Sequence, residues 1–181
     1  YCSEDATSID KYVVYNYGEG TWTIGEMTRS SWIDEGIFNN PMATYTEPSG
    51  TGYLYNHETG NDDDGSPMDN VFIESSDFAL GSGEQFQSIS RIIPDVKFTG
   101  NGGSDQTINF VLKQRNFPGE SLATDSTNTC TATTTKIDTR LRARQAALRI
   151  ESDDDNSLGA RLGVGFRVGT TRMDLKPNGR R

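Results

Sequence analysis

The chain has 181 residues, 33% hydrophobic residues and a formal net charge of -9 at pH 7. This length suits one domain or two small ones, and the hydrophobic content is low for a globule that buries its own core. With 19 glycines among many serines and threonines, a loop-rich β protein or a part of an assembly is expected. Because no apolar run approaches about 18 residues, we expect no membrane-spanning segment.

The charges are distributed unevenly along the chain. Residues 1–90 contain 16 acidic residues and only Lys11 and Arg29 as bases, whereas residues 91–181 contain 10 acidic and 15 basic residues. Such polarity orients subunits head to tail or keeps an acidic surface away from nucleic acid. From charge alone, it is equally possible that these charges lie on solvated faces and that their sign has no function.

The amino-terminal part shows short strand patterns. Residues 11–17 are β-branched and aromatic, a Gly-Glu-Gly turn follows, and residues 21–24 form a second apolar run. Two such runs around a glycine-containing turn predict a hairpin. Further short strands are expected at residues 42–46 and 53–55.

Several brief strands in residues 1–60 suit a propeller-blade-like segment or one sheet of a sandwich. A single blade cannot bury both of its faces. We therefore expect Tyr1 to begin inside a longer polypeptide, with the neighbouring blades in the preceding sequence.

Residues 61–69 form an acidic joint whose composition favours turns and solvent. The carboxylates of the joint and its flank are Glu58, Asp62, Asp63 and Asp64. If Gly65 takes the sixth place of a helix-flanked calcium loop, Val71 falls at the twelfth, where a bidentate Glu is required. That motif fails, although an irregular calcium site stays open beside a solvated turn.

Residues 70–181 are predicted to form an antiparallel β-sandwich of six or seven strands. Residues 71–78 and 86–98 are extended, and residues 107–113 alternate apolar with polar side chains. Threonines in residues 121–135 favour an edge strand over its later part. Alternation resumes after Gly159, at Leu162, Val164, Phe166 and Val168, with a final segment at 173–175.

Residues 136–151 are compatible with a helix or a strand. Ile137, Leu141 and Leu148 would share one helical face. The alternation of Leu141 and Ala143 with arginines is typical instead of a half-buried strand. We prefer the strand, with a bulge near Gln145 that restores the phase.

No catalytic, cofactor or metal motif is present, and we expect no enzyme activity. The single histidine, His57, excludes a site with two His ligands, and no nucleophile elbow accompanies it. The glycines form no phosphate-binding loop. Cys2 and Cys130 are far apart in sequence, and two reduced thiols are favoured over a disulfide.

Arg140, Arg142 and Arg144 occupy alternate positions, so they would project from one face of a strand. With Arg149, such a row meets DNA phosphates or the carboxylates of a neighbouring subunit. Because the chain is acidic and no aromatic residues interleave with the row, subunit or intramolecular ion pairs are favoured over nucleic acid.

Whole phrases of the sequence carry a resemblance to a known family. These are KYVVYNY, TWTIGEMTRSSW, GYLYNHETGNDDDGSPM, FIESSDFALGSGE, SRIIPDVKFTG, RNFPG, RLRARQAALRIESDD and RMDLKPNGRR. Their order resembles the carboxyl-terminal part of nozzle, or tail tubular, proteins of short-tailed bacteriophages and related prophages. Those proteins contain β-propeller material and lie below the portal and adaptor.

The resemblance implies a virion structural protein of the phage tail, assembled in the host cytoplasm. It implies a homohexameric ring that contacts the portal, adaptor and other tail proteins, with phage DNA passing through its lumen. We expect an acidic lining, which repels phosphates and lets the duplex slide. A carbohydrate-recognising or carbohydrate-degrading host-contact module is the alternative, and exposed Trp22, Trp32 and Tyr53 would favour it.

Overall fold

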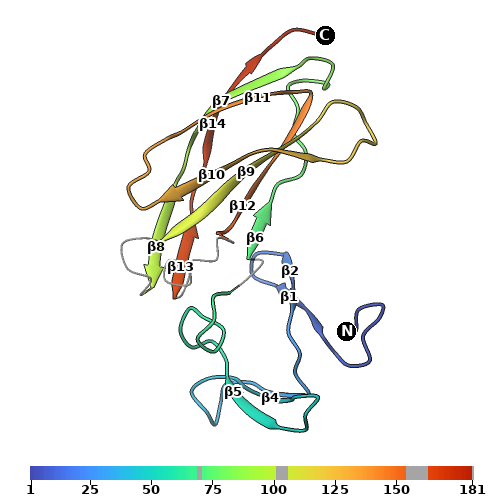
Figure 1. Ribbon diagram of the computed structural model, residues 1–181, viewed down its shortest axis with the longest axis vertical. Coiled ribbons are helices and arrows are strands. Elements are labelled where there is room, and N and C mark those ends of the chain that lie inside the picture. The colour runs from blue at the N-terminus through green and yellow to red at the C-terminus, as the bar shows by residue number, and fades with distance from the viewer. Residues whose placement is uncertain (69–70, 101–105, 154–162, 181) are drawn as a thin grey trace. The chain divides into compact units, whose positions relative to one another are not determined.

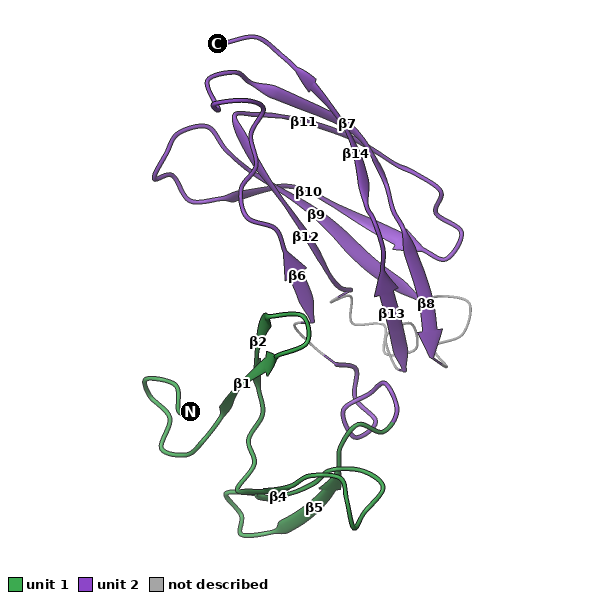
Figure 2. Cartoon of the chain, turned by 180° about the vertical axis from the view of Figure 1, so that it is seen from behind, with its two compact units in different colours: residues 1–59 green, residues 60–181 purple. Residues whose placement is uncertain are grey.

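The computed structural model describes residues 1–68, 71–100, 106–153 and 163–180. It divides into two compact units, unit 1 at residues 1–59 and unit 2 at residues 60–181 (Figure 2). The described residues form strands, turns and bends without a helix, so the all-β prediction is confirmed. Within them, no helix has the length and apolar character needed to cross a bilayer.

Unit 1 contains a hairpin and a separate three-stranded sheet, both antiparallel (Figure 1). Its strands are β1 (Lys11–Asn16), β2 (Thr21–Glu26), β3 (Ser31–Ile33), β4 (Met42–Thr46) and β5 (Gly52–Asn56). The predicted hairpin is present, with Asn16 opposite Thr21. These strands form a hairpin and a separate sheet in order β3-β4-β5.

The hairpin turn is fixed by one polar side chain. The Asn16 side-chain oxygen accepts hydrogen bonds from the backbone N–H groups of Gly18 at 3.0 Å and Glu19 at 3.2 Å. Gly20 has a φ of 67°, which glycine adopts without strain. The Gly-containing turn therefore closes the hairpin as its residue types predict.

Unit 2 has nine strands among its described residues, rather than the six or seven predicted. They are β6 (Phe72–Glu74), β7 (Gln87–Ile93), β8 (Val96–Gly100), β9 (Thr107–Arg115), β10 (Ala123–Thr131), β11 (Ile137–Ala143), β12 (Gln145–Ser152), β13 (Val164–Val168) and β14 (Arg172–Pro177). One sheet has the order β10-β9-β12-β6, a second has the order β11-β7-β14, and β13 pairs with β8.

The extra strands arise where long extended runs bend. Pro94 separates β7 from β8, since proline cannot donate to the ladder. Opposite this bend, the backbone oxygen of Asp95 accepts from Gly169 N at 2.7 Å, and its carboxylate accepts from Thr170 N at 2.9 Å. The β13-β8 pair thus continues the β14-β7 ladder beyond the bend.

The core of unit 2 lies between its two larger sheets, an arrangement that resembles a β-sandwich. Ile89 and Ile92 come from the second sheet, and Phe110, Leu112 and Ile150 come from the first; all are buried. Alternate residues of β9 and β12 point into this layer, as the periodicity of a strand predicts: Ile108, Phe110 and Leu112 in β9, and Ala146, Leu148 and Ile150 in β12.

The segment predicted as one strand with a bulge near Gln145 is two strands in different sheets. β11 pairs with β7, whereas β12 pairs with β9 and β6. The chain bends at Arg144 and crosses from one sheet to the other, which changes the phase of the apolar residues. The strand prediction is therefore confirmed, and the predicted bulge is wrong.

Candidate functional site

Unit 1 buries almost none of its apolar side chains. Only Pro41 and Ala43 are buried in this unit, all of whose residues are described. Its exposed large apolar residues are Tyr1, Ile9, Tyr12, Val13, Val14, Tyr15, Tyr17, Trp22, Ile24, Trp32, Ile33, Ile37, Phe38, Tyr53 and Leu54. We call this set the apolar surface of unit 1.

The hairpin contributes apolar side chains on both of its faces. Val13 and Val14 are consecutive in β1, so they point to opposite sides, and both are exposed. The rings of Tyr15 and Trp22 stack at 4.4 Å across the strand pair. A two-stranded hairpin is marginally stable on its own in water, and this one leaves apolar side chains exposed on both faces.

Residues 32–38 combine apolar and acidic side chains, and all are exposed. Ile37 is 90% exposed, an unusual value for an isoleucine. The Trp32 indole N–H donates to Asp34 at 2.7 Å, while Glu35 is exposed to solvent. This segment therefore presents carboxylates beside large apolar groups.

Aromatic residues gather on one face of the β3-β4-β5 sheet. Tyr45 pairs with Tyr53 in register, and the Tyr53 ring is also 5.9 Å from Tyr55. Because directly opposite residues point to the same side, Trp32, opposite Ala43 and hence Tyr55, shares this face.

His57 and Arg29 are held at the edge of this aromatic face. The Arg29 guanidinium lies 4.6 Å from the centre of the Tyr55 ring, and its Nε donates to His57 Nε2 at 3.1 Å. The His57 ring is 4.7 Å from Trp32. His57 therefore contacts the side chains of Arg29 and Trp32, which is consistent with a structural role.

Unit 1 is strongly acidic, with nine Asp and Glu residues against Lys11 and Arg29. Lys11 pairs with Glu26 at 3.2 Å, and this contact raises the pKa of the lysine. Asp10 accepts from Ser3 Oγ at 2.5 Å and Ser3 N at 2.8 Å, which lowers its pKa. Among the charged residues of unit 1, which also carries the apolar surface, carboxylates outnumber bases.

Unit 2 has a basic face on the outer side of the β11-β7-β14 sheet. Arg142 and Lys176 both lie opposite Ser88, so the three side chains share one side of the sheet. We define the basic face by Lys136, Arg140, Arg142, Arg91, Arg172 and Lys176 together with Asp138 and Asp174.

The basic face carries a surplus of positive charge. Its two carboxylates each pair with a cation, Asp174 with Arg91 at 2.6 Å and Asp138 with Lys136 at 2.7 Å. Among the described residues that define the face, six cations oppose two carboxylates, a surplus of four. Arg140 and Arg142 are exposed on it, as the sequence alternation predicts.

The outer side of the other large sheet holds its charges in ion pairs. Glu74 accepts from Lys113 at 2.7 Å and from Arg149 at 3.3 Å, and Arg149 also pairs with Glu151. The bond from Lys113 is the main cause of the lowered pKa of Glu74. Burial alone would lower the pKa of Arg149, but its two carboxylate partners raise it.

The predicted arginine row is therefore divided between two environments. Arg149 faces the ion-paired side, where its guanidinium also lies 3.6 Å from the centre of the Phe72 ring. Arg144, at the bend between the sheets, lies over the Phe86 ring at 5.1 Å, with Arg142 on the same ring at 4.0 Å. Only Arg140 and Arg142 belong to the basic face.

The described part of the acidic joint is a tight turn. Asp63 and Ser66 exchange backbone hydrogen bonds at 2.8 and 2.9 Å, and the two residues between them, Asp64 and Gly65, have φ values of 50° and 80°. This Asp-Gly pair is typical of a type I′ turn. The Asp62 carboxylate accepts from Gly65 N at 3.0 Å, so it stabilises the turn.

Asp63 and Asp64 are exposed, as is Glu58, which has a φ of 58°. Among the described residues, no group of three or more His, Cys, Asp or Glu is arranged to hold a metal ion. Cys2 is exposed and Cys130 is buried, and burial raises the pKa of the Cys130 thiol.

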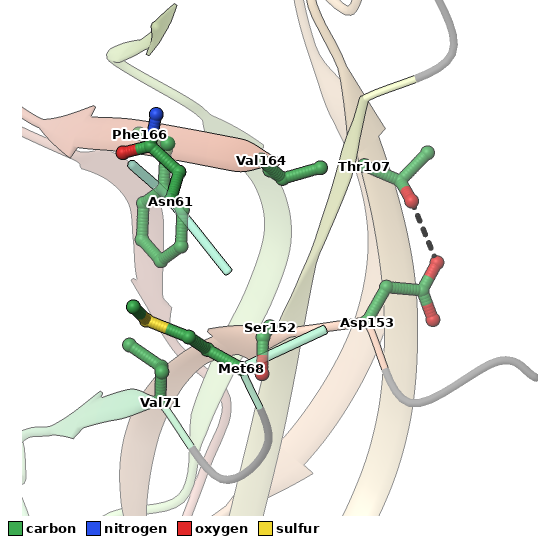
Figure 3. A pocket seen from close by; sticks show the side chains of 9 residues that line it. Asn61, Met68, Val71, Thr107, Ser152, Asp153, Val164 and Phe166 are labelled. Atoms are coloured by element: carbon green, nitrogen blue, oxygen red, sulfur yellow. Dashed lines mark hydrogen bonds between the residues drawn. The ribbon is translucent and has the colours of Figure 1, made fainter. Parts of the chain in front are cut away.

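A cavity of about 270 Å³ lies at one end of the sandwich (Figure 3). Its lining residues are Asn61, Met68, Val71, Thr107, Ser152, Asp153, Val164, Gly165 and Phe166. Met68 and Val71 lie together on one side, and the Asp153 carboxylate accepts from Thr107 at 2.8 Å (Figure 3). Asp153 also accepts from Asn109 at 3.1 Å, so this carboxylate holds the strand ends together.

Only part of the basic face can be predicted from the sequence. Strand alternation predicted Arg140 and Arg142, but Arg91, Arg172 and Lys176 come from other strands. Their proximity follows from the pairing of β7 with β11 and β14, which periodicity in one segment does not specify. The chain matches no protein-family model and no curated protein.

Proposed function

We propose that this chain is a structural protein of a bacteriophage tail, of the nozzle or tail-tube type. Its subunits pack against one another to form part of the channel through which the genome is retained and released. Sister subunits, the portal or adaptor and other tail proteins are its partners, and it performs no bond chemistry.

The apolar surface of unit 1 is the observation that carries the proposal. Burying one large apolar side chain contributes about 1.5–3 kcal/mol, so covering about four of them is worth roughly the whole stability of a small domain. A chain that leaves fifteen such side chains exposed in a 59-residue unit is suited to an assembly that covers them.

The acidity of unit 1 supports a role beside DNA rather than on it. A surface with nine carboxylates and two bases repels phosphates. Duplex DNA then passes such a surface without being held.

The test is the location of the chain in particles. Antibodies against the purified chain are applied to phage particles produced by the strain that encodes it, and the particles are imaged by electron microscopy. Label at the tail below the capsid is the expected result. Particles without label, from a preparation in which the chain is detected only outside virions, would contradict the proposal.

A second candidate function is carbohydrate recognition at the host surface. The exposed Trp32 and Tyr53 on the aromatic face favour it, because flat aromatic rings stack on sugar rings. The cavity of about 180 Å³ beside Arg29 and Tyr45 has no carboxylate in its lining, which favours binding over hydrolysis. Quenching or a shift of tryptophan emission by host polysaccharide would support this candidate.

A further inference from the structure

We propose that the basic face of unit 2 docks on unit 1 of a second copy of this chain. This inference rests on the proposed function, because it names the surfaces by which sister subunits pack. It assigns to the β11-β7-β14 sheet a protein partner of acidic and aromatic character.

Charge complementarity is the first step. The basic face has a surplus of four positive charges, and unit 1 has a net charge of -7 from nine carboxylates and two bases. The outer side of the other large sheet offers no comparable surplus, since Lys113 and Arg149 are paired with Glu74 and Glu151. One side of the sandwich is thus suited to an acidic partner.

The chemistry of arginine is the second step. A guanidinium pairs with carboxylates and also stacks on aromatic rings, and its stem covers apolar surface. This chain already uses such stacking: Arg142 lies 4.0 Å from the Phe86 ring centre, and Arg29 lies 4.6 Å from that of Tyr55. Unit 1 offers both kinds of group together, as in Trp32–Phe38 with Asp34 and Glu35.

The contact joins two different surfaces, so it is heterologous. Contacts of this type form closed rings when the rotation between copies closes, and filaments when it does not. The same contact repeated between successive copies would cover one side of the apolar surface of unit 1 together with the basic face of unit 2. This arrangement accounts for the charge polarity of the chain.

Charge reversal in the 181-residue chain tests the proposal. A face variant carries Arg140→Glu and Lys176→Glu, and an acid variant carries Glu19→Arg and Glu35→Arg in unit 1; all four side chains are exposed. The matched control is Lys97→Glu with Arg167→Glu, an exposed pair opposite each other in the β13-β8 sheet. The control changes the net charge as the face variant does, but outside the basic face.

Native mass by sedimentation is measured for each variant, with circular dichroism to confirm folding. We expect the wild type and the control to assemble, and the face variant to raise the dissociation constant at least about tenfold. Mixing the face and acid variants restores assembly, because each reversed surface then meets a reversed partner. That rescue also shows that both variants fold.

Three outcomes would overturn the inference. Assembly of the face variant with wild-type affinity would do so while leaving the proposed function standing, since subunits would pack through another surface. A wild type that stays monomeric at every concentration would count against both. Salt-sensitive binding of duplex DNA, lost in the face variant and kept in the control, would assign the face to nucleic acid.

Discussion

Glu74 connects two cations on the ion-paired side of the sandwich. Its carboxylate lies 2.7 Å from Lys113 Nζ and 3.3 Å from Arg149 Nη1. Replacing it by glutamine leaves these cations facing each other with one fewer partner. We expect Glu74→Gln to lower the free energy of unfolding of unit 2 by about 1–2 kcal/mol at pH 7, measured by thermal or urea denaturation.

This effect depends on pH in a defined direction. Because the folded-state pKa of Glu74 lies below its ordinary value of 4.5, the stabilisation is complete above that value and is lost as pH falls through the folded pKa. The difference between Glu74→Gln and wild type should therefore shrink in acid. Glu84→Gln, at an exposed position, serves as the control. An undiminished difference well below pH 4 would contradict the assignment.

The two cysteines should react at very different rates. Cys130 is 1% exposed and burial raises the pKa of its thiol, so the reactive thiolate is scarce and shielded. Cys2 is exposed. We expect mass spectrometry to show alkylation of Cys2 in the folded protein and of Cys130 only after denaturation. Equal labelling of the two cysteines without denaturant would contradict the burial of Cys130 in β10.

For individual residues, the sequence predicts which side chains are exposed better than it predicts which residues they contact. Alternation correctly places Arg140 and Arg142 outward because each is followed on the same strand by a buried residue, Leu141 or Ala143. It fails for Arg144 and Arg149, because a change of sheet lies between β11 and β12 and periodicity carries no information across a bend. Ion pairs such as Arg149 with Glu74 join residues far apart in sequence.

Close backbone approach decides the stability of the β13-β8 pair. A Cβ atom on Gly165 would lie 2.7 Å from the backbone oxygen of Thr99, which cannot move without separating the strands. We expect Gly165→Ala to destabilise unit 2 by about 1–3 kcal/mol. Hydrogen exchange should show the loss first in the amides of Val164–Val168.

Gly52 offers a matched control for that substitution. It also lies in an antiparallel strand, but a Cβ atom there would meet no other atom within 4 Å. Gly52→Ala should leave the protein's stability within about 0.5 kcal/mol of wild type. Equal effects of the two substitutions would mean that strand propensity, rather than the contact with Thr99, decides the outcome.

Strand existence is more predictable than strand pairing in this chain. The apolar side chains at alternate positions 108, 110 and 112 predict the strand that is observed as β9. The pairing of β9 with both β10 and β12 depends on contacts between segments that no local pattern specifies. The break between β7 and β8 at Pro94 follows from the missing N–H group of proline. The hydrogen bond from Gly169 N to the backbone oxygen of Asp95 beside this break depends on tertiary structure.

For the whole molecule, the acidity of unit 1 predicts weak contact with DNA. A labelled duplex at low salt should show no tight binding to the chain, because nine carboxylates in unit 1 oppose its approach. The basic face makes this a demanding test, since cations in a row are the usual contact for phosphates. Tight binding that weakens steeply with salt would contradict an acidic channel lining.

The composition predicts an incomplete hydrophobic core, which is the central feature of the whole molecule. A hydrophobic content of 33% suggested that the chain does not complete its own core. The structure places the deficit in unit 1, whereas unit 2 has a buried core of its own. Composition alone does not locate such a deficit, because unit 1 has many large apolar residues and lacks only the layers to cover them.

Both tryptophans of the chain, Trp22 and Trp32, lie in the exposed apolar surface of unit 1. Their emission maximum therefore reports directly whether other polypeptide covers that surface. Measured over a dilution series of the 181-residue chain, the maximum should lie at short wavelength when copies are associated and shift to longer wavelength as they separate. Emission typical of water-exposed indole at every concentration, from a monomeric and folded chain, would contradict the account.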